Sequence, residues 1–465
     1  IKPLTEVCQK GDHLGVFQFE SFIAGQVLEN VKPDNFDELA ACSAILRPGP
    51  LRMGMHEQFA KNKLDNDVKI PKCLQNILGP TRGIIVYQEQ YMQMALEFGL
   101  SMNEVNLFRK AISKIFNSPE AEAKRLEKIE SYHKIFINGA IKPDKIGNKE
   151  EAEKWWELIK SFAAYGFNKA HCVSYTYVSY REYWLKYYYD LEFNVALLNN
   201  TPKGKEDNGE SVIASYISQI MAKGYTIKGP TITDAYEQFS INSKNEIVWG
   251  FNSIKGLSNT ISSKIIEERN KKQFSSLNDF YNRVNPDKRS IDALLWSGAF
   301  DGVEIEQETD IFGCSYYSCT TREEIEEFIF KKLRNEKRFE KNSFSIKEKI
   351  EKEKEYLNIS FIEINNFAEI RKEIGNKVKL QFQSNCSSEG KYNVYGVVSS
   401  IMNKTTKTGK KYQQFSIYDE TGSIKNISIW QWKTNVSVKK EDRGIFKIQI
   451  DDKGFKSLIS FVKYG

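Results

Sequence analysis

The sequence has few of the residues that build metal sites and disulfide frameworks. Its seven cysteines are scattered and form no Cys-x-x-Cys pair, and its four histidines are dispersed, at positions 13, 56, 133 and 171. Zinc sites need closely spaced Cys and His ligands, and disulfide scaffolds need dense, paired cysteines. The sequence therefore predicts neither kind of site, and it fits the reduced thiols of a cytoplasmic protein.

Long apolar runs are also missing. No run approaches the roughly 18 residues that a membrane helix needs, and the first residues do not have the pattern of a secretory leader. We therefore expect no membrane partner. Because the sequence begins with Ile1 and not with Met, we expect it to be a fragment of a longer protein.

What remains is a mixed and mildly basic composition. The 465 residues are 40% hydrophobic and 28% charged, with a net charge of +6. Such a composition is typical of a globular protein, and the length accommodates several domains. The net charge is compatible with a polyanionic partner, but only local clustering of cations would form a binding face.

Hydrophobic periodicity predicts a multidomain, mainly α chain that ends in a small β-barrel. Residues before about 200 repeat apolar positions at helical spacing, and Pro119 after Ser118 predicts a helix start. From Lys391 the apolar period becomes two, as in short strands of an oligonucleotide-binding (OB) barrel. The predicted segments are 1–200 (helical), 210–302 (a second helical unit after a linker), 303–375 (a charged connector) and 376–465 (the barrel).

A basic cluster occupies residues 109–114, which read RKAISK. On a helix, Arg109 and Lys110 lie beside each other, and Lys114 lies one turn beyond Lys110. Cations at this spacing can contact a polyphosphate, and an Arg can hold its oxygens in bidentate fashion. The alternative is an ordinary solvated helix face, since charge runs usually face water.

Residues 162–171, with the sequence FAAYGFNKAH, mix glycine, amide, cation and imidazole between aromatics. Buried polar groups without partners cost free energy, so this mixture favours a surface that holds an anionic ligand. Asn168, Lys169 and His171 offer the donors. The alternative is a tight turn with a satisfied histidine. A rigid Pro/Gly turn at 46–50 similarly places Arg47, either near a ligand or simply on the surface.

Residues 251–258, FNSIKGLS, precede a predicted helix to about Arg269 and resemble a helix-hairpin-helix motif. In such a motif, backbone N–H groups at the helix start can bind a phosphate without reading bases. Lys255, Gly256 and Ser258 are the candidate DNA-binding residues. Only one glycine is present where the motif usually has two, and an ordinary packing unit is the alternative.

The barrel segment combines aromatic rings with a basic loop. Stacked rings beside cations suit single-stranded nucleic acid, at about 1–3 kcal/mol per stacked base. The alternative is that half of the rings belong to the barrel core. The cations are Lys404, Lys407, Lys410 and Lys411, and the rings are Tyr392, Tyr395, Tyr412, Phe415, Trp430 and Trp432. A further set of tyrosines between 175 and 189 is expected mainly to pack between helices.

Four segments together resemble the family C replicative polymerases, the alpha subunits of bacterial DNA polymerase III. They are GVFQFES at 15–21, LRPGP at 46–50, GIIVYQEQ at 83–90 and FAAYGFNKAH at 162–171. Ala164 and Ala170 depart from the family's usual Gly and Ser. The resemblance implies polymerase fingers at 1–200, in which Arg109, Lys110, Lys114, Asn168, Lys169, His171 and Arg47 contact the incoming nucleotide.

The resemblance also implies partners. Residues 307–312, QETDIF, lie where this family carries an internal sliding-clamp motif, with Gln307, Ile311 and Phe312 as docking residues. The implied partners are primed DNA template, deoxynucleoside triphosphates, the sliding clamp and other replicase subunits. The implied cofactor is Mg²⁺, held in the full enzyme by palm aspartates that lie outside this chain.

No catalytic or metal-binding residue is therefore expected on this chain, and alone it is expected to be inactive. The one Asp-x-Asp, at Asp65 and Asp67, lies in a polar stretch and predicts a turn. Two functions stay open: part of a replicative DNA polymerase, or a non-catalytic nucleic-acid-binding protein that reuses polymerase fingers, hairpin and OB modules.

Overall fold

A computed structural model describes most of the chain. The described residues are 1–65, 67–113, 118–163, 166–202, 206–207, 210–301, 303–307, 315–318, 322–327, 344–375, 380–381, 386, 389–406, 408–419, 422–430, 436–440, 442–451 and 454–464. They divide into an N-terminal unit, Ile1–Asp190, and a C-terminal unit, Leu191–Gly465. No helix in these ranges is both long and apolar enough to span a membrane.

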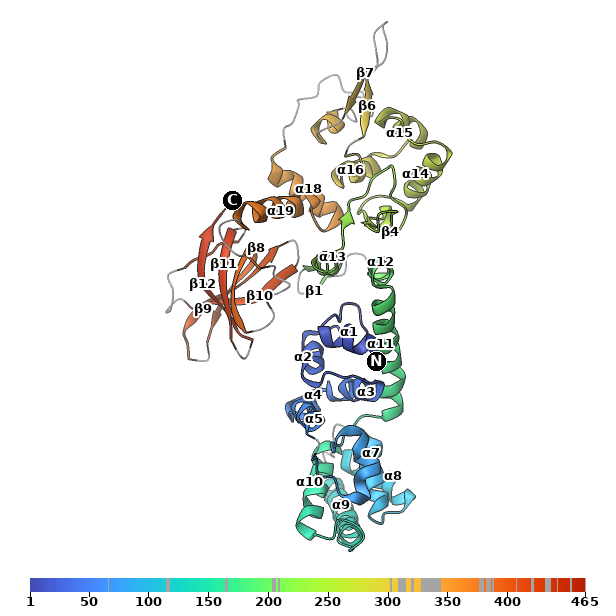
Figure 1. Ribbon diagram of the computed structural model, residues 1–465, viewed down its shortest axis with the longest axis vertical. Coiled ribbons are helices and arrows are strands. Elements are labelled where there is room, and N and C mark those ends of the chain that lie inside the picture. The colour runs from blue at the N-terminus through green and yellow to red at the C-terminus, as the bar shows by residue number, and fades with distance from the viewer. Residues whose placement is uncertain are drawn as a thin grey trace. The chain divides into compact units, whose positions relative to one another are not determined.

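The N-terminal unit is built from helices, as the periodicity predicted (Figure 1). They are α1 (Lys2–Glu6), η1 (Cys8–Lys10), α2 (Phe22–Val31), α3 (Phe36–Ile45), α4 (Pro48–Arg52), α5 (Met55–Leu64), η2 (Lys72–Leu74), α6 (Gln75–Leu78), η3 (Gly79–Thr81), α7 (Gln88–Glu97), α8 (Met102–Ser113), α9 (Pro119–Ala140), α10 (Lys149–Ala163) and α11 (Lys169–Tyr188).

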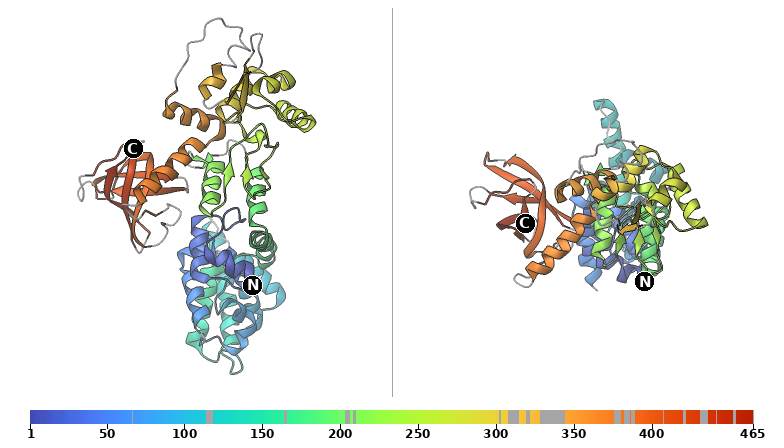
Figure 2. Two further views of the ribbon diagram at one scale, coloured as in Figure 1. Left: turned by 45° about the horizontal axis from the view of Figure 1, so that its top comes forward. Right: turned by 90° about the horizontal axis from the view of Figure 1, so that it is seen from above.

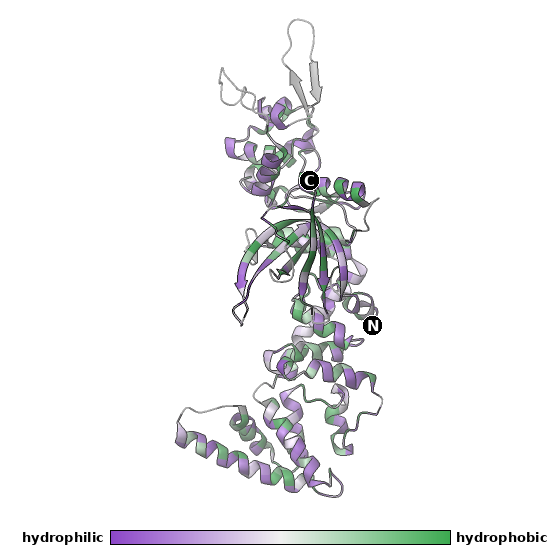
Figure 3. Ribbon diagram, turned by 90° about the vertical axis from the view of Figure 1, so that its left-hand side faces the viewer, coloured by the Kyte–Doolittle hydropathy of each residue, from purple (hydrophilic) through white to green (hydrophobic). Residues whose placement is uncertain are grey.

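Local signals set several of these helix starts. Ser21 and Asn35 cap α2 and α3 by accepting a hydrogen bond from a first-turn N–H. Pro119 stands in the first turn of α9, so the predicted start there is confirmed. Hydrophobic and hydrophilic residues alternate along most of the helices, as the mixed colours of Figure 3 show.

A buried aromatic cluster packs the four helices α7, α8, α9 and α10 together. Phe108 of α8 stacks on Trp156 of α10 with ring centroids 5.4 Å apart, and Phe98 meets Phe136 of α9 edge to face at 4.8 Å. Aromatic pairs in this geometry add to the gain from burial alone. The cluster therefore fixes α8, which carries the predicted basic residues, against its neighbours.

His13 is a buried, neutral histidine in the same unit. Its Nδ1 lies 2.8 Å from the Tyr183 hydroxyl, and Asp12 and Lys186 are the charged groups beside it. Burial lowers the pKa of His13 from 6.5 to about 4. Between pH 6.5 and pH 4, His13 is therefore protonated in the unfolded chain but not in the folded protein. The free energy of unfolding should fall as the pH drops through this range.

This gives a testable pH dependence. Between pH 7.5 and pH 5 the N-terminal unit should lose about 2 kcal/mol of unfolding free energy through His13. Denaturant titration at the two pH values measures the loss, and a His13→Gln variant should largely lack it. The same pH dependence in both proteins would contradict a neutral buried His13.

The C-terminal unit begins with helices and short strands around the predicted hairpin. Its elements before the barrel are α12 (Asp190–Asn200), β1 (Glu206–Asp207), β2 (Glu210–Ser211), α13 (Val212–Ala222), β3 (Ile227–Lys228), β4 (Ser240–Ile241), β5 (Ile247–Val248), η4 (Phe251–Ser253), α14 (Asn259–Lys271), α15 (Leu277–Val284), α16 (Lys288–Trp296), β6 (Glu304–Gln307), β7 (Ser315–Ser318), α18 (Ile346–Leu357) and α19 (Phe361–Gly375). Strands β3, β5 and β4 form a small sheet.

The chain ends in a closed barrel of the predicted kind. Its strands are β8 (Gly390–Thr405), β9 (Lys411–Asp419), β10 (Gly422–Ile429), β11 (Arg443–Ile450) and β12 (Lys456–Lys463). Their order around the barrel is β10-β12-β11-β8-β9, and a parallel pairing of β10 with β12 closes it. Closure leaves no unpaired sheet edge.

One face of the barrel departs from the simple alternation in the sequence. Val394 and Val398 point into the barrel core, while Tyr395 and Val397, on the other face of β8, are equally buried. Phe367 and Ile374 of α19 cover that outer face (Figure 2). A helix therefore buries part of the surface that a period of two would leave exposed to solvent.

Candidate nucleotide and nucleic-acid interface

The start of α11 lies against the start of α7. Gln88 N–H donates to the Phe167 carbonyl at 3.0 Å, and Tyr87 and Phe167 form a parallel bridge. A Cβ on Gly166 would come within 3.0 Å of the Tyr91 ring. The glycine that the sequence associated with a ligand thus allows α7 and the segment before α11 to pack closely.

Asn168 is the cap of α11. Its Oδ1 accepts from the His171 N–H at 2.8 Å, and its Nδ2 donates to Glu89 Oε1 at 2.7 Å. Glu89 Oε2 also accepts from the Lys169 N–H at 2.9 Å. A carboxylate at a helix N-terminus is favourable. Both the Asn168 amide and the Lys169 N–H are therefore engaged within the protein.

Three of the predicted nucleotide-binding residues gather around Phe167. The Arg47 guanidinium lies over the Phe167 ring, 4.3 Å from its centroid. The His171 ring meets the same ring edge to face at 5.3 Å. The Lys169 ammonium lies 5.6 Å from the centroid of the neighbouring Tyr87 ring. Cation–π contacts hold the Arg47 and Lys169 charges without neutralising them.

Arg109 reaches the same region from α8. Burial raises the pKa of Tyr91 to about 12, and the positive charge of Arg109 opposes that rise while Glu89 adds to it. Tyr91 is also the ring that faces Gly166. Arg109 is half-buried on α8. Lys110 is exposed on α8, and Lys114 lies outside the described residues.

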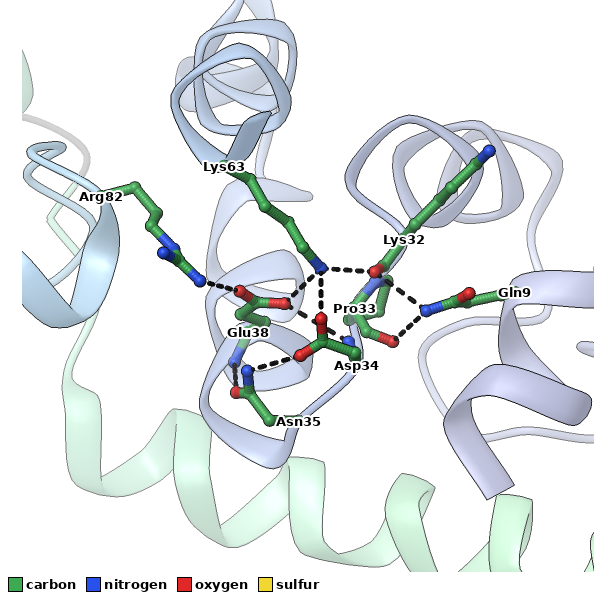
Figure 4. Close-up of polar contacts among 8 residues, drawn as sticks. All are labelled: Gln9, Lys32, Pro33, Asp34, Asn35, Glu38, Lys63 and Arg82. Carbon is green, nitrogen blue, oxygen red and sulfur yellow. Dashed lines mark hydrogen bonds and ion pairs between the residues drawn. The ribbon is translucent and has the colours of Figure 1, made fainter. Parts of the chain in front are cut away.

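Two other cations of the unit are already engaged. Glu38, buried on α3, accepts from Lys63 at 2.6 Å and from Arg82 at 2.9 Å (Figure 4). Lys63 also donates to the Lys32 carbonyl at 2.6 Å. A buried carboxylate needs such partners. Lys63 and Arg82 therefore stabilise the packing around α3 and α5.

The tyrosines of α11 divide between two environments. Tyr183 is fully buried, as the packing interpretation expected. Four others are exposed along the helix: Tyr175, Tyr177, Tyr188 and Tyr189. Tyr175 stacks on Phe17 with centroids 5.6 Å apart and lies 4.3 Å from the His171 ring. Packing therefore explains only part of this stripe.

The hairpin turn has the backbone that its sequence suggested. Gly256 has a φ of +90°, a left-handed conformation that favours glycine. Ser258 caps α14 by accepting from Ile261 N–H at 3.3 Å. The Lys255 N–H donates to the Tyr356 carbonyl of α18 at 2.9 Å, so Lys255 offers its exposed ammonium and not its amide.

Arg289 is a cation near this turn that the sequence analysis missed. A Cβ on Gly256 would lie 3.5 Å from Arg289 Nε. Arg289 is exposed in the first turn of α16, and its guanidinium has no hydrogen bond or ion pair with the residues that the structure describes. Residues 287–300, which follow a turn and lead into α16, resemble a second and weaker copy of the hairpin pattern, and this is the sequence signal that could have found Arg289.

The barrel rings follow both of the interpretations offered. Tyr395 and Phe415 are buried, so these two rings cannot stack on a base. Tyr412 and Trp430 stack on each other with centroids 4.8 Å apart and are partly exposed. Lys410 and Lys411 are exposed at the β8–β9 turn, next to Tyr412. Lys407 and Trp432 lie outside the described residues.

The remaining predicted residues are only partly described. Gln307 ends β6, and only its backbone is described, while Ile311 and Phe312 lie outside the described residues.

The one Asp-x-Asp segment forms a turn, as predicted, because the Asp67 N–H donates to Asp65 Oδ1 at 2.8 Å. Within the described ranges, no group of three or more His, Cys, Asp or Glu could hold a metal ion.

Comparison with known families gives two matches within the chain. Residues 2–141 match the family described as "Bacterial DNA polymerase III alpha subunit finger domain". Residues 224–309 match the family described as "Helix-hairpin-helix motif". The first range includes Arg47, Glu89 and Arg109, and the second includes the Gly256 turn and Arg289.

Curated relatives extend the similarity. DNA polymerase III subunit alpha of Campylobacter jejuni is 30% identical over 439 residues, which cover 90% of this chain and 35% of the relative. The Aquifex aeolicus subunit is 31% identical over 91% of this chain and 35% of its own length. The Escherichia coli K12 subunit is 34% identical over 64% of this chain and 26% of its own length. The chain thus spans about a third of the length of the first two relatives.

Proposed function

This chain belongs with the bacterial DNA polymerase III alpha subunits, and from that premise we propose that it supplies the nucleotide-binding and DNA-binding parts of a replicative DNA polymerase. The observation that carries the proposal is the grouping of Arg47, Lys169 and His171 at the start of α11. Arg47 and His171 contact Phe167, and Lys169 contacts Tyr87.

The reaction proposed for the whole enzyme is template-directed nucleotidyl transfer. A primer 3′-hydroxyl attacks the α-phosphate of a deoxynucleoside triphosphate, and pyrophosphate leaves. Catalysis of such a step consists mainly of positioning and of neutralising charge. The share proposed for this chain is to hold the triphosphate through the side chains of Arg109, Lys110, Lys114, Lys169, His171 and Arg47.

Mg²⁺ would supply further charge neutralisation in the full enzyme. The carboxylates that the structure describes do not fit such an ion: none belongs to a group of three ligands, and Asp65 and Asp67 form a turn. We propose that the ligands of this ion lie outside this chain.

The C-terminal unit would hold the nucleic acid. Lys255, the Gly256 turn and Ser258 would contact the duplex backbone, joined by Arg289. Exposed Lys410 and Lys411 and the Tyr412–Trp430 pair would contact single-stranded template. Gln307, Ile311 and Phe312 would dock the sliding clamp and raise the effective concentration of the polymerase at the primer end. A cytoplasmic replicase with further subunits is the expected setting.

Salt dependence tests the duplex contact. An Arg289→Gln variant should bind primed duplex DNA about threefold to tenfold more weakly, the effect of about 1 kcal/mol. Because one phosphate contact is lost, the slope of log affinity against log salt should shrink by about 1. Fluorescence anisotropy at several salt concentrations measures both quantities.

Lys272 offers a matched control, since it is an exposed cation at the opposite end of α14. Lys272→Gln should leave affinity and slope within experimental error. Equal losses in the two variants would mean that general charge, and not the hairpin surface, attracts DNA. If the unsubstituted chain fails to bind primed DNA at every salt concentration tested, the proposed function is rejected.

A further inference from the structure

Glu89 places a negative charge among the cations of the proposed nucleotide site. It stands in the first turn of α7 and is half-buried where α7 and α11 begin side by side (Figure 1). A carboxylate near a triphosphate should repel it. The presence of Glu89 here therefore needs an explanation other than ligand attraction.

The contacts of Glu89 supply that explanation. Each of its oxygens accepts one hydrogen bond from the start of α11, at 2.7 Å from Asn168 Nδ2 and at 2.9 Å from Lys169 N–H. Asn168 itself holds the first turn of the helix, because its Oδ1 accepts a hydrogen bond from the His171 N–H at 2.8 Å. Hydrogen bonds to a charged acceptor are the stronger kind, and the helix N-terminus favours the negative charge.

A chain of hydrogen bonds thus runs from α7 through Asn168 to the first turn of α11. The side chains that leave this turn are Lys169 and His171, and Lys169 itself lies over Tyr87, two residues before Glu89. Movement of the α11 start relative to α7 would redirect both side chains. The cluster around Phe167 depends on the same start, because Gln88 N–H donates to the Phe167 carbonyl.

We propose that Glu89 is a positioning residue of the nucleotide site: its carboxylate fixes the start of α11 against α7 and so directs Lys169 and His171 towards the triphosphate. This inference rests on the proposed function. It assigns Glu89 no contact with the nucleotide. Its contribution to binding is geometric, and it outweighs the repulsion that its charge exerts on the ligand.

The two effects of Glu89 have opposite signs, which makes the inference testable. Glu89→Ala removes both hydrogen bonds and the repulsion. If positioning dominates, binding weakens, and if repulsion dominates, binding tightens. Glu89→Gln removes the charge but keeps one acceptor oxygen, so its affinity should lie between those of the alanine variant and the unsubstituted chain. A carboxylate that merely stabilised the fold would change the melting temperature and leave affinity alone.

The experiment is a titration of the full 465-residue chain with dATP and Mg²⁺, followed by ³¹P NMR. Glu89→Ala should raise the dissociation constant about fivefold to tenfold. Hydrogen exchange of the amides of Lys169 and His171 should become faster in the same variant. Glu97→Gln is the control, since Glu97 ends the same helix and pairs with Lys145 at 2.6 Å. It should change affinity less than twofold.

Unchanged or tighter binding by Glu89→Ala would overturn the positioning role and leave the proposed function standing. Absence of saturable binding by the unsubstituted chain would overturn both. Equal weakening by Glu89→Ala and Glu97→Gln would also overturn the positioning role of Glu89, because a general loosening of α7 would then account for the weaker binding.

Discussion

Replacing Arg109 with Ala should weaken use of the deoxynucleoside triphosphate about 30-fold to 100-fold, because the lost hydrogen bonds to a charged ligand contribute about 2 to 3 kcal/mol. Arg109 is half-buried on α8 beside Tyr91, where its charge is screened less than at an exposed site. Primer extension in a complex that supplies the palm would measure this as a fall in kcat/KM for the nucleotide.

Binding of primed DNA should stay nearly unchanged in the same variant. Lys110 is exposed on the same helix, so Lys110→Ala should weaken nucleotide use less than Arg109→Ala does. Equal losses of nucleotide use and DNA binding would reject the assigned role of Arg109. A nucleotide response that is absent even from the unsubstituted protein would favour a non-catalytic nucleic-acid-binding protein.

Replacing Gly139 with Ala should destabilise the N-terminal unit by about 3 kcal/mol or more, as forced overpacking of a core does. A Cβ at this position of α9 would lie 1.8 Å from the Phe98 carbonyl oxygen and 2.5 Å from its carbon. Both atoms belong to the backbone, so a rotamer change cannot relieve the clash. Denaturant unfolding, followed by the fluorescence of tryptophans such as the buried Trp156, would measure the loss of unfolding free energy.

Helix propensity alone predicts the opposite sign, since Ala stabilises a helix by about 1 kcal/mol relative to Gly. Gly25 in α2 is the matched control, because a Cβ there would meet only the His13 ring, at 3.5 Å. Gly25→Ala should be neutral or stabilising. A neutral Gly139→Ala would show that α9 does not approach the Phe98 backbone as closely as described.

Features determined by neighbouring residues were predictable from the sequence. Pro119 marks a helix start because its own φ and missing N–H suit that position, and the Gly256 turn follows from the left-handed backbone that glycine allows. The change to a period of two at Lys391 predicted the barrel. For Pro119 and Gly256, the signal and the structure that it specifies lie within a few residues.

Features that depend on distant residues were not predictable in this way. Glu89 contacts Asn168 and Lys169 across about 80 positions of sequence, and no local pattern reports such a pairing. Tyr395 was among the candidate rings for base stacking because periodicity cannot show that α19 covers its face. The segment at 83–90 that carried the family resemblance already contained Glu89, but without a fold its role could not be assigned.

The most direct test of the account is an experimental structure of this chain with a deoxynucleoside triphosphate and Mg²⁺ bound. The account predicts phosphate oxygens within hydrogen-bond distance of both Arg109 and the Lys169 ammonium, with Glu89 still joined to Asn168. A triphosphate bound elsewhere, or contacts from only one of those two cations while the other points away from the ligand, would contradict it.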